Sequence, residues 1–104
     1  MDKQNVSCER KNGQLIFYIS GSFDYKSGVQ LKNLANKELE LGREKEYVID
    51  LKNVRYINSS VFGAMIILKE IFGATSESFS LINASPEVLK MLKTVHFHTL
   101  FNIR

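Results

Sequence analysis

The segment 47–72 constrains the fold more than any other part of this chain. Residues 47–51, YVIDL, form a short apolar run with the β-branched and aromatic content of a buried strand. A short polar turn at Lys52-Asn53 and a second apolar run at 54–57 follow. After the polar residues 58–60 come a dozen residues that are almost all apolar, which predicts a helix. The segment therefore predicts a strand, a turn and a helix in succession.

Asn58, Ser59 and Ser60 stand where this helix is expected to begin. Asparagine is among the best N-caps, because its side-chain oxygen accepts a hydrogen bond from an unpaired N–H of the first turn. A helix N-terminus also carries free N–H donors and about half a positive charge, which favours an anion. A serine hydroxyl there could carry a phosphate that is partly stabilised. Spacing alone favours the simpler interpretation, in which the three residues only cap the helix.

The rest of the chain alternates strands and helices. Asn12-Gly13 is typical of a tight hairpin and predicts an antiparallel pair from residues 6–9 and 14–20. Asp24, or a hydroxyl near it, can cap a following helix, and Gly42 is well placed to end that helix. These features predict an α/β domain with one small mixed sheet and more helices on one face than on the other. The further predicted elements are a helix at 26–41, a strand at 79–83, a helix starting at Ser85-Pro86-Glu87, and an apolar tail at 97–103 that packs on the core.

The predicted helix at 58–72 is apolar nearly all the way round. Such a helix is usually buried on several sides. In a small domain it either packs centrally, between the sheet and its neighbours, or exposes an apolar patch to a partner. Central packing is favoured, and a mixture of the two remains open.

Composition excludes several classes of protein. The length predicts one domain spanning residues 1–104, and the hydrophobic fraction of 44% is ordinary for a folded protein. The net charge of +3 is spread along the chain without the clustered patch of a nucleic-acid binder. The N-terminus is polar, and no apolar run approaches the roughly 18 residues of a membrane span. We therefore expect a cytoplasmic protein with no membrane insertion and, given the single Cys8, no intrachain disulfide.

Groups suited to catalysis are few. His96 and His98 would share a face of a strand, but no nearby acid or cysteine completes a metal site, so structural histidines are the expectation. Asp24 and Asp50 could form an acid–base pair, although turn and cap roles are more common at strand ends. No motif of a hydrolase, a nucleotide-binding loop or a zinc protease occurs. We expect no enzyme activity, no cofactor and no metal.

The order of these motifs resembles the STAS domain, and within it the short, single-domain anti-sigma factor antagonists. The resemblance covers almost the whole chain and rests on Gly21-Ser22-Phe23-Asp24, on 48–51, on Tyr56 to Gly63 and on Ser85-Pro86-Glu87. It implies a STAS-type mixed sheet of four to five strands with about four helices, mostly on one face. In the family signature the first serine after the central strand is phosphorylated, and that serine matches Ser59.

The resemblance also implies a partner-switching cycle. The unphosphorylated protein would bind an anti-sigma factor serine kinase, which uses ATP and magnesium, and phosphorylation of Ser59 would release it. A PP2C-type phosphatase would reset the serine. The partner-binding residues would be Asp24, Asn58, Ser60, Val61 and Phe62.

Three positions depart from the family signature. Asn58 replaces an aspartate, Val61 a glycine and Phe62 a leucine. Asn58 and Val61 favour an alternative, a STAS module that is never phosphorylated and acts as a scaffold of a transporter or signalling complex. The intact pair Ser59-Ser60 favours the phosphorylated antagonist.

Overall fold

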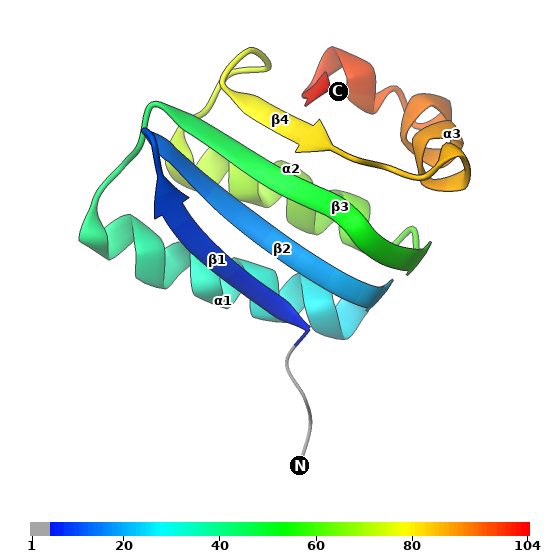
Figure 1. Ribbon diagram of the computed structural model, residues 1–104, viewed down its shortest axis with the longest axis horizontal. Coiled ribbons are helices and arrows are strands. Elements are labelled where there is room, and N and C mark those ends of the chain that lie inside the picture. Colours follow the sequence, from blue (N-terminus) through cyan, green and yellow to red (C-terminus); the bar gives the residue numbers. More distant parts are fainter. Residues whose placement is uncertain (1–4) are drawn as a thin grey trace.

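The computed structural model describes residues 5–104 and shows a mixed sheet with the strand order β1-β2-β3-β4-β5 (Figure 1). β1 and β2 are antiparallel, and the other neighbouring strands are parallel. The mixed α/β class is confirmed. The elements in chain order are β1 (Val6–Lys11), β2 (Gln14–Phe23), α1 (Tyr25–Leu41), β3 (Glu46–Ile57), α2 (Val61–Phe72), β4 (Phe79–Ile82), α3 (Pro86–Thr94), the 3₁₀ helix η1 (Phe97–Thr99) and β5 (Asn102–Ile103).

Helices α1 and α2 cover one face of the sheet, and the opposite face is open (Figure 1). The prediction of helices mostly on one face is therefore confirmed. Among residues 5–104 there are three α-helices and one 3₁₀ helix, a minor difference from about four helices. The predicted apolar tail forms η1 and β5, and its Phe97 and Phe101 are buried.

The core lies between the sheet and the two helices. Aromatic side chains fill its centre: the Tyr47 ring stacks on Phe72 at 4.3 Å, and Phe79 meets Phe101 edge to face at 5.3 Å. Helix α2 buries one face completely, whereas Ile67 on the opposite face is 40% exposed. Central packing of α2 is thus the main outcome, with a small apolar exposure. The buried residues of α2 are Val61, Ala64, Met65, Leu68 and Phe72.

Strand β3 differs from its prediction. The pair Lys52-Asn53, expected as a turn, lies inside one continuous strand, Glu46–Ile57. Its pairing with β2 shifts register twice, first between Tyr18 and Ser20 and again between Gly21 and Ser22. Bulges of this kind add a residue to one strand without ending it. They lengthen β3 to the point where the next helix begins.

Candidate functional site

The ends of β2 and β3 meet side by side and place the starts of two helices together. Phe23 and Ile57, the last residues of these strands, are direct neighbours in the sheet. The backbone N–H of Asn58 donates to the carbonyl of Phe23 at 2.9 Å, which joins the two chain turns. Since α1 begins at Tyr25 and α2 at Val61, both N-termini open at this edge. We call the two turns, Asp24 and Asn58-Ser59-Ser60, the helix mouth.

The N-cap residue of α2 is Ser60 and not Asn58 as predicted; Asn58 instead holds the turn just before the helix. Its Oδ1 accepts a hydrogen bond from the backbone N–H of Ser60 at 2.9 Å. The Asn58 carbonyl accepts from the N–H of Val61 at 3.1 Å, and the Ser59 carbonyl accepts from Phe62 at 3.2 Å. Three successive N–H groups of the first turn therefore already have acceptors. The expectation that this turn presents unpaired donors to an anion is not met at these positions.

The side chain of Ser59 takes no part in holding this turn. Its side chain is exposed, and within residues 5–104 its hydroxyl has no hydrogen-bond partner. Ser60 is also exposed and makes no side-chain cap. The structure therefore separates two roles that the sequence left combined: Asn58 stabilises the turn, and the serine hydroxyls project into solvent.

Asp24 caps the other helix of the mouth. Its Oδ1 accepts from the backbone N–H and from the hydroxyl of Ser27, both at 3.1 Å. The bond from the Ser27 N–H is the main reason why the pKa of the Asp24 carboxyl lies below its usual value. Ser27 is buried, and its hydroxyl also contacts the Ser22 carbonyl and the amide of Asn5. The Asn5 side chain in turn donates to the carbonyls of Ser20 and Ser22 at 2.8 Å.

Close packing of α1 on α2 fixes the geometry of the mouth. A Cβ atom at Gly28 would lie 3.3 Å from the Cβ of Ala64 and 3.8 Å from a methyl of Val61. Gly28 therefore lets the first turns of the two helices approach. Val61, predicted as a partner-binding residue, is fully buried in this contact. Any effect of Val61 on a partner therefore acts through the position of the turn.

Aromatic side chains surround the mouth. Phe62 is half-buried and packs edge to face against Phe97 at 5.1 Å. Tyr25 and Tyr56 are 71% and 57% exposed, although tyrosines of strands and helix starts are often buried. Sequence reasoning missed both, because a single apolar position does not show which face it occupies. Exposed tyrosines are enriched among the residues that anchor protein interfaces.

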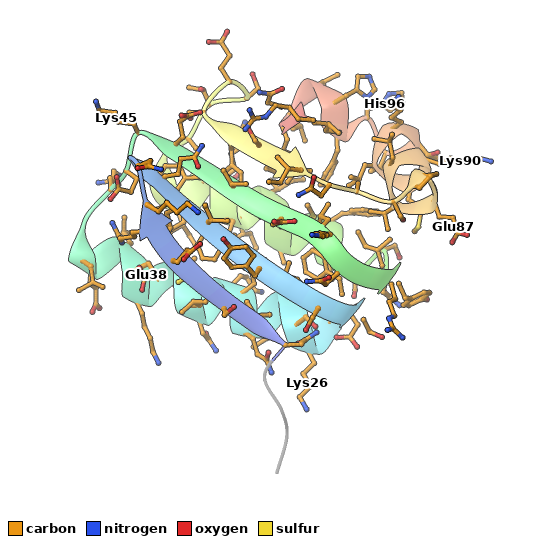
Figure 2. All side chains as sticks on the ribbon, in the orientation of Figure 1. Lys26, Glu38, Lys45, Glu87, Lys90 and His96 are labelled. Atoms are coloured by element: carbon orange, nitrogen blue, oxygen red, sulfur yellow. The ribbon has the colours of Figure 1, made fainter. Side chains whose placement is uncertain are left out.

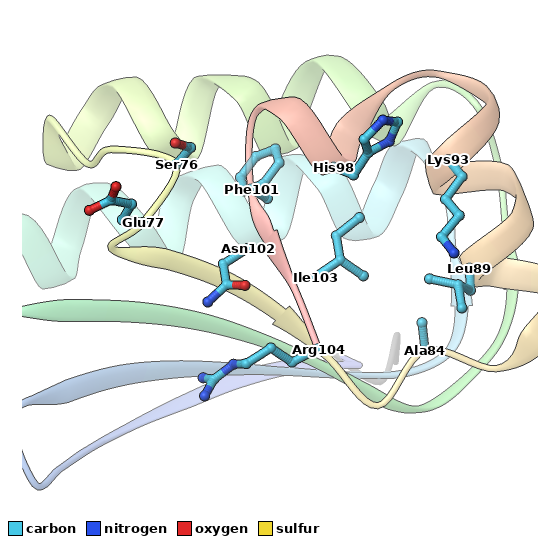
Figure 3. Close-up of a pocket in the computed structure, with 10 residues that line it drawn as sticks. All are labelled: Ser76, Glu77, Ala84, Leu89, Lys93, His98, Phe101, Asn102, Ile103 and Arg104. Atoms are coloured by element: carbon cyan, nitrogen blue, oxygen red, sulfur yellow. The ribbon is translucent and has the colours of Figure 1, made fainter.

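Other candidate groups lie elsewhere. His96 and His98 are exposed on and beside η1, with ring centroids 5.8 Å apart. Within the described chain, no three His, Cys, Asp or Glu side chains gather as metal ligands. A hollow of about 640 Å³ lies between α3 and β5 (Figure 3) and includes no residue of the helix mouth. No helix within residues 5–104 has the length and apolarity to cross a membrane.

A family model describing the STAS domain matches residues 5–104. The chain belongs to the STAS domain family. A STAS-domain-containing protein of Pseudomonas aeruginosa (strain UCBPP-PA14) is 33% identical over 90 residues, which are 86% of this chain and 87% of that protein.

Two solved structures share the fold of this STAS domain. A putative anti-sigma factor antagonist from Thermotoga maritima aligns with a TM-score of 0.79 at 16% identity, over 94% of this chain and 84% of that one. The Bacillus cell fate determinant SpoIIAA in its phosphorylated form aligns with a TM-score of 0.70 at 14% identity, over 95% and 90%. At such identities the likeness concerns the fold.

Proposed function

We propose that this STAS domain is an anti-sigma factor antagonist-like regulator in a partner-switching pathway. It binds an anti-sigma serine kinase when Ser59 is unphosphorylated, and phosphorylation of Ser59 releases it. A PP2C-type phosphatase restores the serine. The domain itself catalyses nothing, and the ATP and magnesium belong to the kinase. The cycle takes place in the cytoplasm.

The observation that carries the proposal is the exposed, unpartnered hydroxyl of Ser59 at a turn held by Asn58. A kinase can reach such a hydroxyl without unfolding the turn. The existence of a phosphorylated form of SpoIIAA, which has the same fold, supports a modification of this type.

The charges of the mouth explain how phosphorylation would release a partner. A phosphate adds about −1.5 to −2 charges at neutral pH. The first-turn N–H groups of Ser60, Val61 and Phe62 already have acceptors, so the phosphate gains few hydrogen bonds inside the domain. The carboxylate of Asp24 across the mouth is ionised, because its pKa is lowered. The added charge therefore acts mainly on the docked partner, and like charges or apolar groups there cost affinity.

The test compares wild type, Ser59→Ala and Ser59→Glu as baits in affinity capture from the native cell, with mass spectrometry. Ser76→Glu adds the same charge at an exposed loop position outside the mouth and serves as the matched control. We expect a kinase of the anti-sigma type on wild type, Ser59→Ala and Ser76→Glu. Ser59→Glu should bind the purified kinase at least about tenfold more weakly, which corresponds to about 1.4 kcal/mol. The kinase with ATP should phosphorylate wild type at Ser59. Equal binding of Ser59→Glu and wild type would refute the switch.

The alternative function is a STAS scaffold that carries no phosphate. It is favoured by Asn58 in the place of the signature aspartate and by Ile67, which is 40% exposed on α2. On this alternative all four baits retain one and the same non-kinase partner. Ile67→Ser would then weaken that partner, whereas Ser59→Glu would not.

A further inference from the structure

The two bulges of β3 produce a surface that a regular strand would lack. Between the pairs Tyr18–Asp50 and Ser20–Asn53, β2 contributes one residue and β3 contributes two. After Val54 the pairing again skips one residue of β3, which is Arg55. The buried positions of this part of β3 consequently recur every third residue, at Leu51, Val54 and Ile57. Each interval holds two exposed residues instead of one, namely Lys52 with Asn53 and Arg55 with Tyr56.

A hollow of about 490 Å³ lies at these bulges. Two cations, Lys52 and Arg55, line it together with the polar side chains of Ser20 and Asn53. The ion pairs found within residues 5–104 are those of Arg10, so neither cation has a partner. The side chains of Ser20 and Asn53 likewise make no hydrogen bond to the described part of the chain. The remaining lining is Gly21 and Val54.

Among residues 5–104, no acidic residue lines the hollow. The nearest acid along β3 is Asp50, and its carboxylate already accepts hydrogen bonds from the Lys52 N–H at 2.9 Å and from the Asn83 amide at 3.2 Å. Within the described part of the chain, the hollow thus presents two positive charges and two neutral polar side chains without a compensating acid in its lining. Arg10, by contrast, is held by Glu38 and Glu44 at 3.1 Å each.

We propose that this hollow binds carboxylate side chains of the protein partner that docks at the helix mouth. Along a strand, Lys52 and Arg55 are separated by at most about 10 Å. Alternate residues of an extended segment lie about 7 Å apart, a spacing that flexible lysine and arginine side chains can reach. The geometry therefore suits two acidic residues of one segment.

The hollow lies close to the mouth along β3. Arg55 precedes Ser59 by four residues, so their Cα atoms lie within about 14 Å. The exposed Tyr56 lies between them in the chain. Arginine and tyrosine are the residue types that most often anchor protein interfaces. The identity of the partner rests on the proposed function. The affinity of the hollow for carboxylates can be measured without that partner.

The test is an NMR titration of the ¹⁵N-labelled protein at low ionic strength. The probe is a capped pentapeptide with glutamates at its second and fourth positions, and its glutamine counterpart is the control peptide. Lys52→Ala/Arg55→Ala removes both cations. Lys90→Ala/Lys93→Ala removes the same net charge from α3 and is the matched control, because neither lysine lines the hollow. Lys90 projects from α3 into solvent (Figure 2).

We expect the acidic peptide to shift the amide signals of Ser20, Gly21 and Asn53, and the glutamine peptide to leave them unchanged. Because two exposed ion pairs each contribute a few-fold to affinity, Lys52→Ala/Arg55→Ala should bind roughly tenfold more weakly. Lys90→Ala/Lys93→Ala should bind like wild type. Raising the salt concentration to about 0.3 M should weaken binding, since the screening length then falls below 10 Å.

If Lys52→Ala/Arg55→Ala and Lys90→Ala/Lys93→Ala weaken peptide binding equally, the proposal is overturned. The peptide would then be attracted by the overall positive charge of the protein and not by the hollow. Inorganic phosphate at the same concentration is a third arm, and shifts with phosphate but not with the peptide would also overturn it. Ser59→Ala should bind the peptide like wild type. Failure of the phosphorylation switch and failure of this site are therefore separate results.

Discussion

Because Asn58 holds the turn before α2 and the Ser59 hydroxyl is free, two neighbouring substitutions should have unequal effects on stability. Asn58→Ala removes the hydrogen bond that the Ser60 N–H donates to Asn58 Oδ1 at 2.9 Å. The backbone bonds of Asn58 to Phe23 and Val61 remain, because alanine keeps both groups. We take the loss of this side-chain-to-backbone bond at a helix start to resemble the loss of an N-cap side chain, which costs about 1 kcal/mol, within a range of about 0.5–2. In a domain of this size that lowers Tm by about 4–8 °C.

Ser59→Ala removes an exposed hydroxyl that bonds to nothing in the described chain, so stability should change by less than about 0.5 kcal/mol. The measurement is urea unfolding, monitored by circular dichroism. The dependence of the free energy of unfolding on urea concentration should be the same in all variants. Asn58→Asp, which retains the acceptor oxygen, is the control and should unfold near the wild-type midpoint. A larger loss for Ser59→Ala than for Asn58→Ala would refute the separation of the two roles.

Three further predictions concern the mouth and the sheet. The lowered pKa of Asp24 means that its stabilisation is present above pH 3.8 and is lost as the pH falls through the lower folded value; Asp24→Asn should flatten the acid limb of a stability–pH curve. The hydrogen bond from Tyr18 to Glu9 raises the pKa of Tyr18 to about 12, so stability should fall between pH 10 and pH 12, and Tyr18→Phe should abolish that slope. Gly28→Leu forces a side chain against Ala64, where even a Cβ would lie at 3.3 Å, and should cost about 1–3 kcal/mol in urea unfolding.

Much of the fold could be predicted because local patterns and long-range packing agree. The Asn12-Gly13 turn has positive φ at both residues, as a tight hairpin requires, and joins β1 to β2. Gly42 ends α1 as expected, and Ser85 caps α3 by accepting a hydrogen bond from the N–H of Val88. In each case a single residue type meets a backbone requirement that few others meet.

The bulged half of β3 could not be predicted, for a physical reason. Alternation of buried and exposed residues is the sequence signal of a strand, and a bulge breaks that alternation. The polar pair Lys52-Asn53 between two apolar runs therefore has the pattern of a turn. Only pairing with β2 shows that the strand continues. The network of Asn5 with Ser27 also escaped prediction, since its members are 22 positions apart and neither belongs to a motif.

If the proposed function holds, the long, bulged strand and the turn held by Asn58 explain how a phosphate on Ser59 alters binding without altering the fold. The bulges carry β3 to Ile57, beside Phe23, so both helices start at the same edge of the sheet. The Asn58 side chain and the 3₁₀-type bonds then hold the turn without using the serine hydroxyl. A charge added at Ser59 consequently changes little in the energy of the folded domain. Its effect falls on whatever contacts the mouth, and that effect is largest for a partner whose own carboxylates already lie at Lys52 and Arg55.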